Sequence, residues 1–185
     1  MIIKNLARNC RKQLAVKMFD DSRNGIQWLG DRGGIYPAYG IPRMDKNQVL
    51  FVFDVPEEKR DKCLVAEYDD ISDYFDISDG ASDNEAVGFG LPMFFGGKLI
   101  YPVSTSGGVA FYEASAFEPI RDCKDAKLYE RYTEAGDLYF VAKDGMMVEA
   151  VISPVPVDKK ELLKRMAAIT AQLKADAETE EEEKA

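Results

Sequence analysis

Residues 12–31, KQLAVKMFDDSRNGIQWLGD, decide the fold because they specify a β-hairpin close to the amino-terminus. Leu14, Val16 and Met18 alternate with other residues along the first half, which is the period of a strand with one buried face. Asn24 and Gly25 follow, and this pair is typical of a tight hairpin turn because both residues accept positive φ angles. The stretch therefore predicts two antiparallel strands.

The same signals predict further strands along the chain. Apolar runs bounded by glycine and proline turns indicate strands at 63–68, 92–103, 107–114, 128–133, 137–143 and 146–152. Residues 30–42 contain too many glycines and prolines for a continuous element, so we expect a loop with one short extended piece. Most of these strands are consecutive and joined by short turns, which favours antiparallel pairing.

Helices are predicted near both ends of the chain. Ile3, Leu6 and Cys10 have helical spacing. Asp45 can cap a short helix that Pro56 stops, although a buried strand is the alternative for that apolar run. At the other end Asp158 begins an amphipathic helix that we expect to pack on the sheet. Its apolar face comprises Leu162, Met166, Ile169 and Leu173.

These elements predict an α+β fold: a mostly antiparallel sheet with a short amino-terminal helix and a carboxy-terminal amphipathic helix. A chain of 185 residues with 46% hydrophobic residues is long enough for one buried core. We therefore expect a single domain over residues 1–175. Half of residues 176–185 are glutamate and the segment has no apolar face, which predicts an acidic, disordered tail.

The composition excludes several kinds of site. The chain has no histidine, which removes imidazole-based nucleophile activation and histidine-ligated zinc. The chain has three cysteines, which lie far apart in the sequence: Cys10, Cys63 and Cys123. Neither a disulfide framework nor a zinc knuckle is therefore predicted. No apolar run is typical of a signal peptide or a membrane span. We expect a cytoplasmic protein without cofactors.

The net charge of -9 is unevenly distributed. Residues 67–85 contain eight acidic residues and no basic one, and residues 176–185 carry a net charge of -5. These two segments account for -13, so the remaining chain carries +4. The acidity therefore lies in one internal segment and the tail, while the body is mildly basic.

The internal acidic segment includes residues 68–80, YDDISDYFDISDG, in which Asp-Ile-Ser-Asp occurs twice. An EF-hand is excluded because a glycine at position six would place Phe75, Ile77 and Ala86 at ligand positions. Three alternatives stay open. In the first, the segment is a helix that aligns Asp69, Asp73 and Asp76 as a row that mimics phosphates. In the second, it is a solvated loop. In the third, it holds a divalent metal. The metal candidates are Asp76, Asp79 and Asp83.

Candidate partner-binding residues lie in this segment and in the glycine-rich stretch 26–42. The acidic candidates are Asp69, Asp70, Asp73, Asp76 and Asp79. Trp28, Tyr36 and Tyr39 can add apolar anchors, although a lone tryptophan is more often part of the core. Arg8, Arg11 and Lys12 form a basic face that can contact nucleic acid, a solvated helix face being the simpler account.

The phrases IQWLGD, YPAYGIP and FDVP, within Ile26 to Pro56, resemble small proteins encoded by phages and prophages. The resemblance extends to residues 98–102, covers under a quarter of the chain and transfers no catalytic residue. It implies an accessory protein of a mobile element acting in a bacterial cytoplasm. Anti-CRISPR proteins and similar inhibitors of host defence belong to that class.

The leading hypothesis is a non-enzymatic interaction protein that binds a basic groove of a nucleic-acid-binding host protein through its acidic surface, in the manner of a DNA mimic. The alternative is a small enzyme or ligand-binding protein that uses Asp, Tyr or Lys, with or without a divalent metal. A structural phage component that self-assembles is a third possibility.

Overall fold

The computed structural model describes residues 1–78 and 84–182, with side chains through residue 174. The chain divides into two compact units, Met1–Val155 and Pro156–Ala185. The first unit contains both sheets and the cores that they enclose. The second contains a single long helix.

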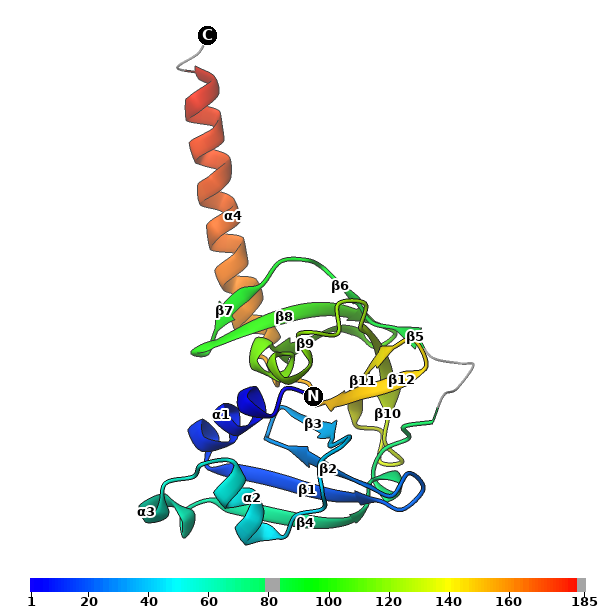
Figure 1. Ribbon diagram of the computed structural model, residues 1–185. Coiled ribbons are helices and arrows are strands. Elements are labelled where there is room, and N and C mark those ends of the chain that lie inside the picture. The colour runs from blue at the N-terminus through cyan, green and yellow to red at the C-terminus, as the bar shows by residue number, and fades with distance from the viewer. Residues whose placement is uncertain (79–83, 183–185) are drawn as a thin grey trace. The chain divides into compact units, whose positions relative to one another are not determined.

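Eight strands form the larger sheet, in the order β4-β1-β2-β3-β12-β11-β10-β5 (Figure 1). They are β1 (Ala15–Asp21), β2 (Ile26–Gly30), β3 (Gly34–Pro37), β4 (Leu64–Asp70), β5 (Asn84–Glu85), β10 (Lys127–Tyr132), β11 (Leu138–Asp144) and β12 (Met147–Ile152). All neighbours in this sheet are antiparallel except β1 and β4, which are parallel. Strand β4 is at one end of the sheet, so its outer edge pairs with no strand of the described residues.

The smaller sheet is built around β8. Its strands are β6 (Val87–Gly88), β7 (Met93–Phe95), β8 (Lys98–Thr105) and β9 (Gly108–Glu113). Strands β6, β7 and β9 all pair antiparallel with β8. The chain passes from one sheet to the other at Ala86, whose amide donates to the Leu128 carbonyl of β10 at 2.8 Å.

The helical elements of the first unit are short. They are α1 (Ile3–Gln13), α2 (Lys46–Val52), α3 (Glu57–Arg60) and the 3-10 turns η1 (Ile71–Asp73), η2 (Ala114–Ala116) and η3 (Glu118–Ile120). Figure 1 shows α1 between the larger sheet and strands β8 and β9. Asp45 caps α2, as predicted: its carboxylate accepts from the Gln48 amide while the Gln48 side chain accepts from the Asp45 amide.

Apolar side chains cover both faces of the larger sheet. On β2, Leu29 belongs to the main core with α1, whereas its neighbour Trp28 belongs to a second cluster on the opposite face. Strand β11 alternates in the same way, with Phe140 in the main core and Tyr139 in the second cluster. The second cluster comprises Phe19, Trp28, Ile35, Ile71, Tyr139, Val141, Val148 and Val151.

The predicted fold class is confirmed, with a large, mostly antiparallel sheet and helices near both ends of the chain.

The turn of the hairpin at residues 12–31 differs from the predicted tight turn. Four residues separate Asp21 from Ile26, and Gly25 has a positive φ of 65° whereas Asn24 does not. The carboxylate of Asp21 holds this wider turn, accepting from the Asn24 amide at 3.0 Å and the Asn24 side chain at 2.9 Å.

The second unit contains α4 (Lys159–Glu182). Asp158 caps it as predicted, accepting from the Lys160 and Glu161 amides at 3.0 and 3.1 Å. The helix continues through residues 176–182, where a disordered tail was predicted, because alanine and glutamate have high helix propensity. The chain divides after Val155, before the boundary at residue 175 that the sequence suggested, because Pro154 and Pro156 end the regular pairing.

The β2–β3 turn buries a carboxyl group. Asp31 is 1% exposed, and its Oδ1 atom accepts from the Gly33 and Gly34 amides at 2.7 and 2.9 Å. Its Oδ2 atom has no hydrogen-bond partner within the described part of the chain. Burial raises the pKa of Asp31, against the effect of the two amides.

We expect this buried carboxyl to make the stability of the chain depend on pH. Because the folded pKa is raised, the contribution of Asp31 is fully present below its unfolded pKa and is lost as pH rises through the folded pKa. The free energy of unfolding of the native chain minus that of Asp31→Asn should therefore decrease as the pH rises above about 4, the ordinary pKa of an aspartate. Urea denaturation at each pH measures it. A difference that stays constant or increases would contradict the assignment.

Candidate functional site

The acidic segment, here residues 67–78, comprises the end of β4, the turn η1 and the extended residues that follow. It is not a continuous helix, so the helical row of Asp69, Asp73 and Asp76, one of the three alternatives left open by the sequence, does not form. Aspartate and serine side chains compete for backbone amides, which favours turns over a helix here. Asp79 and Asp83 lie outside the described residues.

The two Asp-Ile-Ser repeats have the same local structure. Asp70 Oδ1 accepts from the Ser72 amide at 2.9 Å and from the Ser72 hydroxyl at 2.6 Å. Asp76 Oδ1 accepts from the Ser78 amide at 2.9 Å and from its hydroxyl at 2.5 Å. In each repeat the central isoleucine packs into the second cluster, Ile71 fully and Ile77 in part. Each Asp-Ile-Ser repeat thus forms a turn that directs its isoleucine into the second cluster.

Asp70 also joins the acidic segment to the β1–β2 turn. Its Oδ2 atom accepts from the Ser22 amide at 2.8 Å and from the Ser22 hydroxyl. The hydrogen bonds from Ser22 and then Ser72 hold the pKa of Asp70 well below its usual range. The Asp70 carboxylate therefore stabilises the local structure through these hydrogen bonds.

Strands β10 and β11 fix the far end of the segment. The Arg131 guanidinium donates to the Asp76 carbonyl at 2.5 Å and to the Ser78 carbonyl at 2.7 Å. The Tyr139 hydroxyl accepts from the Asp76 amide at 2.9 Å. The Arg131 side chain is only 8% exposed, and one of its nitrogens lies 3.6 Å from Asp76 Oδ1. The hydrogen bonds of Ser78, and to a lesser degree the nearby charge of Arg131, lower the pKa of Asp76.

Aromatic side chains support the segment where it leaves β4. The rings of Phe19 and Tyr68 are stacked with centroids 4.3 Å apart. Tyr74 meets both rings edge-on at 5.5 Å. Tyr68 is 37% exposed and Tyr74 is 41% exposed. The two tyrosines therefore offer partly accessible rings in a fixed arrangement.

Three carboxylates of the segment face solvent. Glu67, Asp69 and Asp73 are exposed and have no hydrogen-bond or ion-pair partner among the described residues. Glu67 lies beside Met18 on β1 and lines a hollow of about 300 Å³. Asp73 lines a second hollow, of about 390 Å³, with Arg23 and Tyr132. Carboxylates without internal partners are available to bind another molecule.

No family model, curated protein or solved structure matches this chain. The resemblance to phage-encoded proteins therefore stays a prediction. None of the helices in residues 1–78 and 84–182 is both long and apolar enough to cross a membrane.

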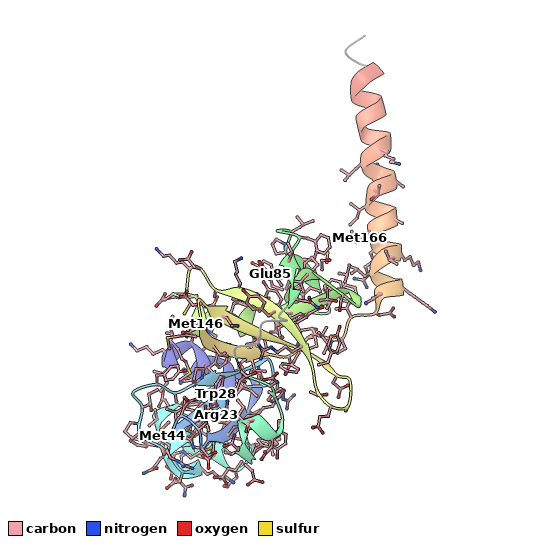
Figure 2. The ribbon with its side chains drawn as sticks, turned by 90° about the vertical axis from the view of Figure 1, so that its right-hand side faces the viewer. Arg23, Trp28, Met44, Glu85, Met146 and Met166 are labelled. Atoms are coloured by element: carbon pink, nitrogen blue, oxygen red, sulfur yellow. The ribbon has the colours of Figure 1, made fainter. Side chains whose placement is uncertain are left out.

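The predicted aromatic anchors have different positions. Trp28 (Figure 2) is 1% exposed and donates from Nε1 to Asp21 Oδ2 at 3.1 Å. Tyr36 is completely buried, and its hydroxyl donates to the Ala116 carbonyl at 2.7 Å. Burial removes both residues from any surface that a partner can reach, as the core interpretation of the lone tryptophan anticipated. Tyr39 alone of the three is exposed, at 45%.

The predicted basic face is partly neutralised within the chain. Arg8 lies 3.3 Å from Glu118, and Arg11 donates to the Phe53 carbonyl at 2.6 Å. Lys12 is exposed. These contacts connect α1 to the segments around it, so two of the three cations have internal structural roles.

The metal hypothesis gains no support from the geometry. No group of three Cys, Asp or Glu side chains that could hold a metal occurs in the part of the chain that the structure describes. Asp76 Oδ1 already accepts hydrogen bonds from the Ser78 amide and hydroxyl. Ser106 and Gly107 form the β8–β9 turn, and the Ser106 amide donates to Glu130 Oε2 at 2.7 Å.

Sequence reasoning missed Arg131, Tyr139 and Ser22, which hold the acidic segment from three other strands or turns. Arg131 lies between Glu130 and Tyr132 in a predicted strand, and the sequence does not indicate that its guanidinium turns inward. The contacts span 48 to 63 residues along the chain, so no local pattern encodes them.

We predict that Arg131→Met destabilises the fold by about 2 to 4 kcal/mol, because the Asp76 and Ser78 carbonyls lose the charged donor that a nearly buried guanidinium supplies. Lys127→Met is the matched control on the same strand, since the contact that Lys127 makes among the described residues is an exposed ion pair with Glu85. Urea denaturation should show a large loss for the first variant and little change for the second. Similar losses in both would contradict the role given to Arg131.

Proposed function

We propose that this chain is a non-enzymatic interaction protein that binds the basic surface of a partner protein through β4 and the acidic segment. The observation that supports this proposal best is the combination of three carboxylates that have no partner among residues 1–78 and 84–182, Glu67, Asp69 and Asp73, with two partly exposed tyrosines on a firmly held backbone. Further support comes from the position of β4 at the end of the sheet.

The edge position of β4 suits an extended partner segment. Edge strands present unpaired backbone groups to which another strand can add. Glu67 and Tyr68 are successive residues opposite Met18 and Phe19, which belong to different faces of the sheet. A segment along this edge would therefore meet Glu67 on one face and Tyr68 on the other.

The charge determines which segments bind. A second copy of β4 would bring Glu67 and Asp69 against like charges, which opposes pairing of the chain with itself. A partner rich in arginine or lysine would gain salt-sensitive attraction and a higher association rate. Arginine side chains can also stack on exposed tyrosine rings.

The partner class that fits this chemistry is a protein whose basic groove otherwise binds nucleic-acid phosphates. Carboxylates held by a rigid backbone can replace phosphates in such a groove. The resemblance of residues 26–56 to phage-encoded proteins suggests a host defence protein as the target, and inhibition in the bacterial cytoplasm as the outcome.

The test compares two triple variants with equal changes of charge. The binding variant is Glu67→Gln, Asp69→Asn and Asp73→Asn. The control variant, at exposed positions elsewhere on the first unit, is Glu58→Gln, Asp122→Asn and Asp125→Asn. Each chain is tagged and used to capture proteins from a bacterial lysate at low and high salt, with duplex DNA as competitor.

We expect the native chain and the control variant to capture a nucleic-acid-binding protein that salt or DNA releases. The binding variant should hold that protein on the order of tenfold more weakly, because it lacks the charges that steer and hold the partner. Equal capture by all three chains, or capture unaffected by DNA and salt, would rule out the proposed surface.

A further inference from the structure

The first half of α4 carries an apolar stripe that has no partner within the second unit, which contains this single helix. Leu162 is half-buried, and Met166, Ile169 and Leu173 are 45%, 60% and 62% exposed. Figure 2 shows Met166 projecting from this helix. The four residues are separated by four, three and four positions, which is the spacing of the contact positions of a coiled coil over two heptads. Such a stripe is normally covered by another helix.

The same spacing continues to a charged residue at each end. Three positions before Leu162 is Lys159, and three positions after Leu173 is Asp176. The helix is thus basic at its start, where Lys159, Lys160, Lys164 and Arg165 accompany Glu161, and acidic from residue 176 onward. It is 24 residues long, so both ends belong to one continuous element.

This charge distribution determines which helix can pair with the apolar stripe of α4. In a parallel pair each residue would meet its own copy, so Lys159 would face lysine, Asp176 would face aspartate, and the glutamate runs would repel each other. In an antiparallel pair Leu162 faces Leu173 and Met166 faces Ile169. Lys159 then faces Asp176. A second copy of this helix in the opposite direction therefore satisfies both the apolar spacing and the charges.

We propose that two copies of this chain associate through an antiparallel pairing of their α4 helices, with Leu162, Met166, Ile169 and Leu173 forming the contact. This association is independent of the acidic segment of the first unit. It uses a helix that forms a compact unit of its own. The pairing is short, so the dimer forms in a concentration-dependent manner.

The first experiment measures the molar mass of the full chain by light scattering from about 1 to about 200 µM. The mass should rise toward twice the value for one chain. Met166→Glu with Ile169→Glu should keep the chain monomeric throughout, with the melting temperature of the first unit unchanged. Ala168→Glu with Ala171→Glu adds the same charge on the opposite face of the helix and should leave the dimer intact.

The second experiment determines the direction of the pairing by disulfide formation in a Cys123→Ser background. Lys159→Cys and Asp176→Cys chains should form a mixed disulfide when combined, and neither should link to itself. Self-linked Lys159→Cys chains would show a parallel pair and overturn the proposal. A monomer at every concentration, or a dimer that survives Met166→Glu with Ile169→Glu, would overturn it as well.

Discussion

The larger sheet has apolar side chains on both faces, and much of the structure follows from the need to cover the second face. The main core is closed by α1, α2 and the smaller sheet, which cover one face. On the other face Trp28, Val141 and Val151 belong to a cluster that the acidic segment covers with Ile71, Phe75 and Ile77. An acidic segment can therefore be structural on its inner side and available for binding on its outer side.

The acidic residues of the segment have two different roles. Asp70 and Asp76 accept hydrogen bonds from the serine two positions later, and Arg131 holds the backbone beside them. Their carboxylates stabilise the turns, which leaves Glu67, Asp69 and Asp73 for a partner. Because the backbone is held in place, a partner would bind these charges without first having to order them, and this preorganisation favours affinity.

The sequence was sufficient to predict the fold class and most elements, because alternation, turn residues and helix caps are local signals. Asp45 and Asp158 cap helices as expected. The parallel pairing of β4 with β1 and the inward Arg131 could not be predicted, since both depend on residues 48 or more positions apart. The same reason explains why Trp28 and Tyr36 were open to two interpretations: a glycine-rich stretch does not reveal which of its aromatic residues are buried.

The acidic segment is a firmly held surface and not a solvated loop. Native-state amide hydrogen exchange of residues 70–78, measured beside strands β10 and β11, distinguishes the two. We expect the amides of Ser72, Asp76 and Ser78, which donate to Asp70, Tyr139 and Asp76, to exchange far more slowly than in the unfolded chain. Arg131→Met should remove the protection of Asp76 and Ser78. Exchange of all three amides at the rate of an unfolded chain would show that the segment is a solvated loop.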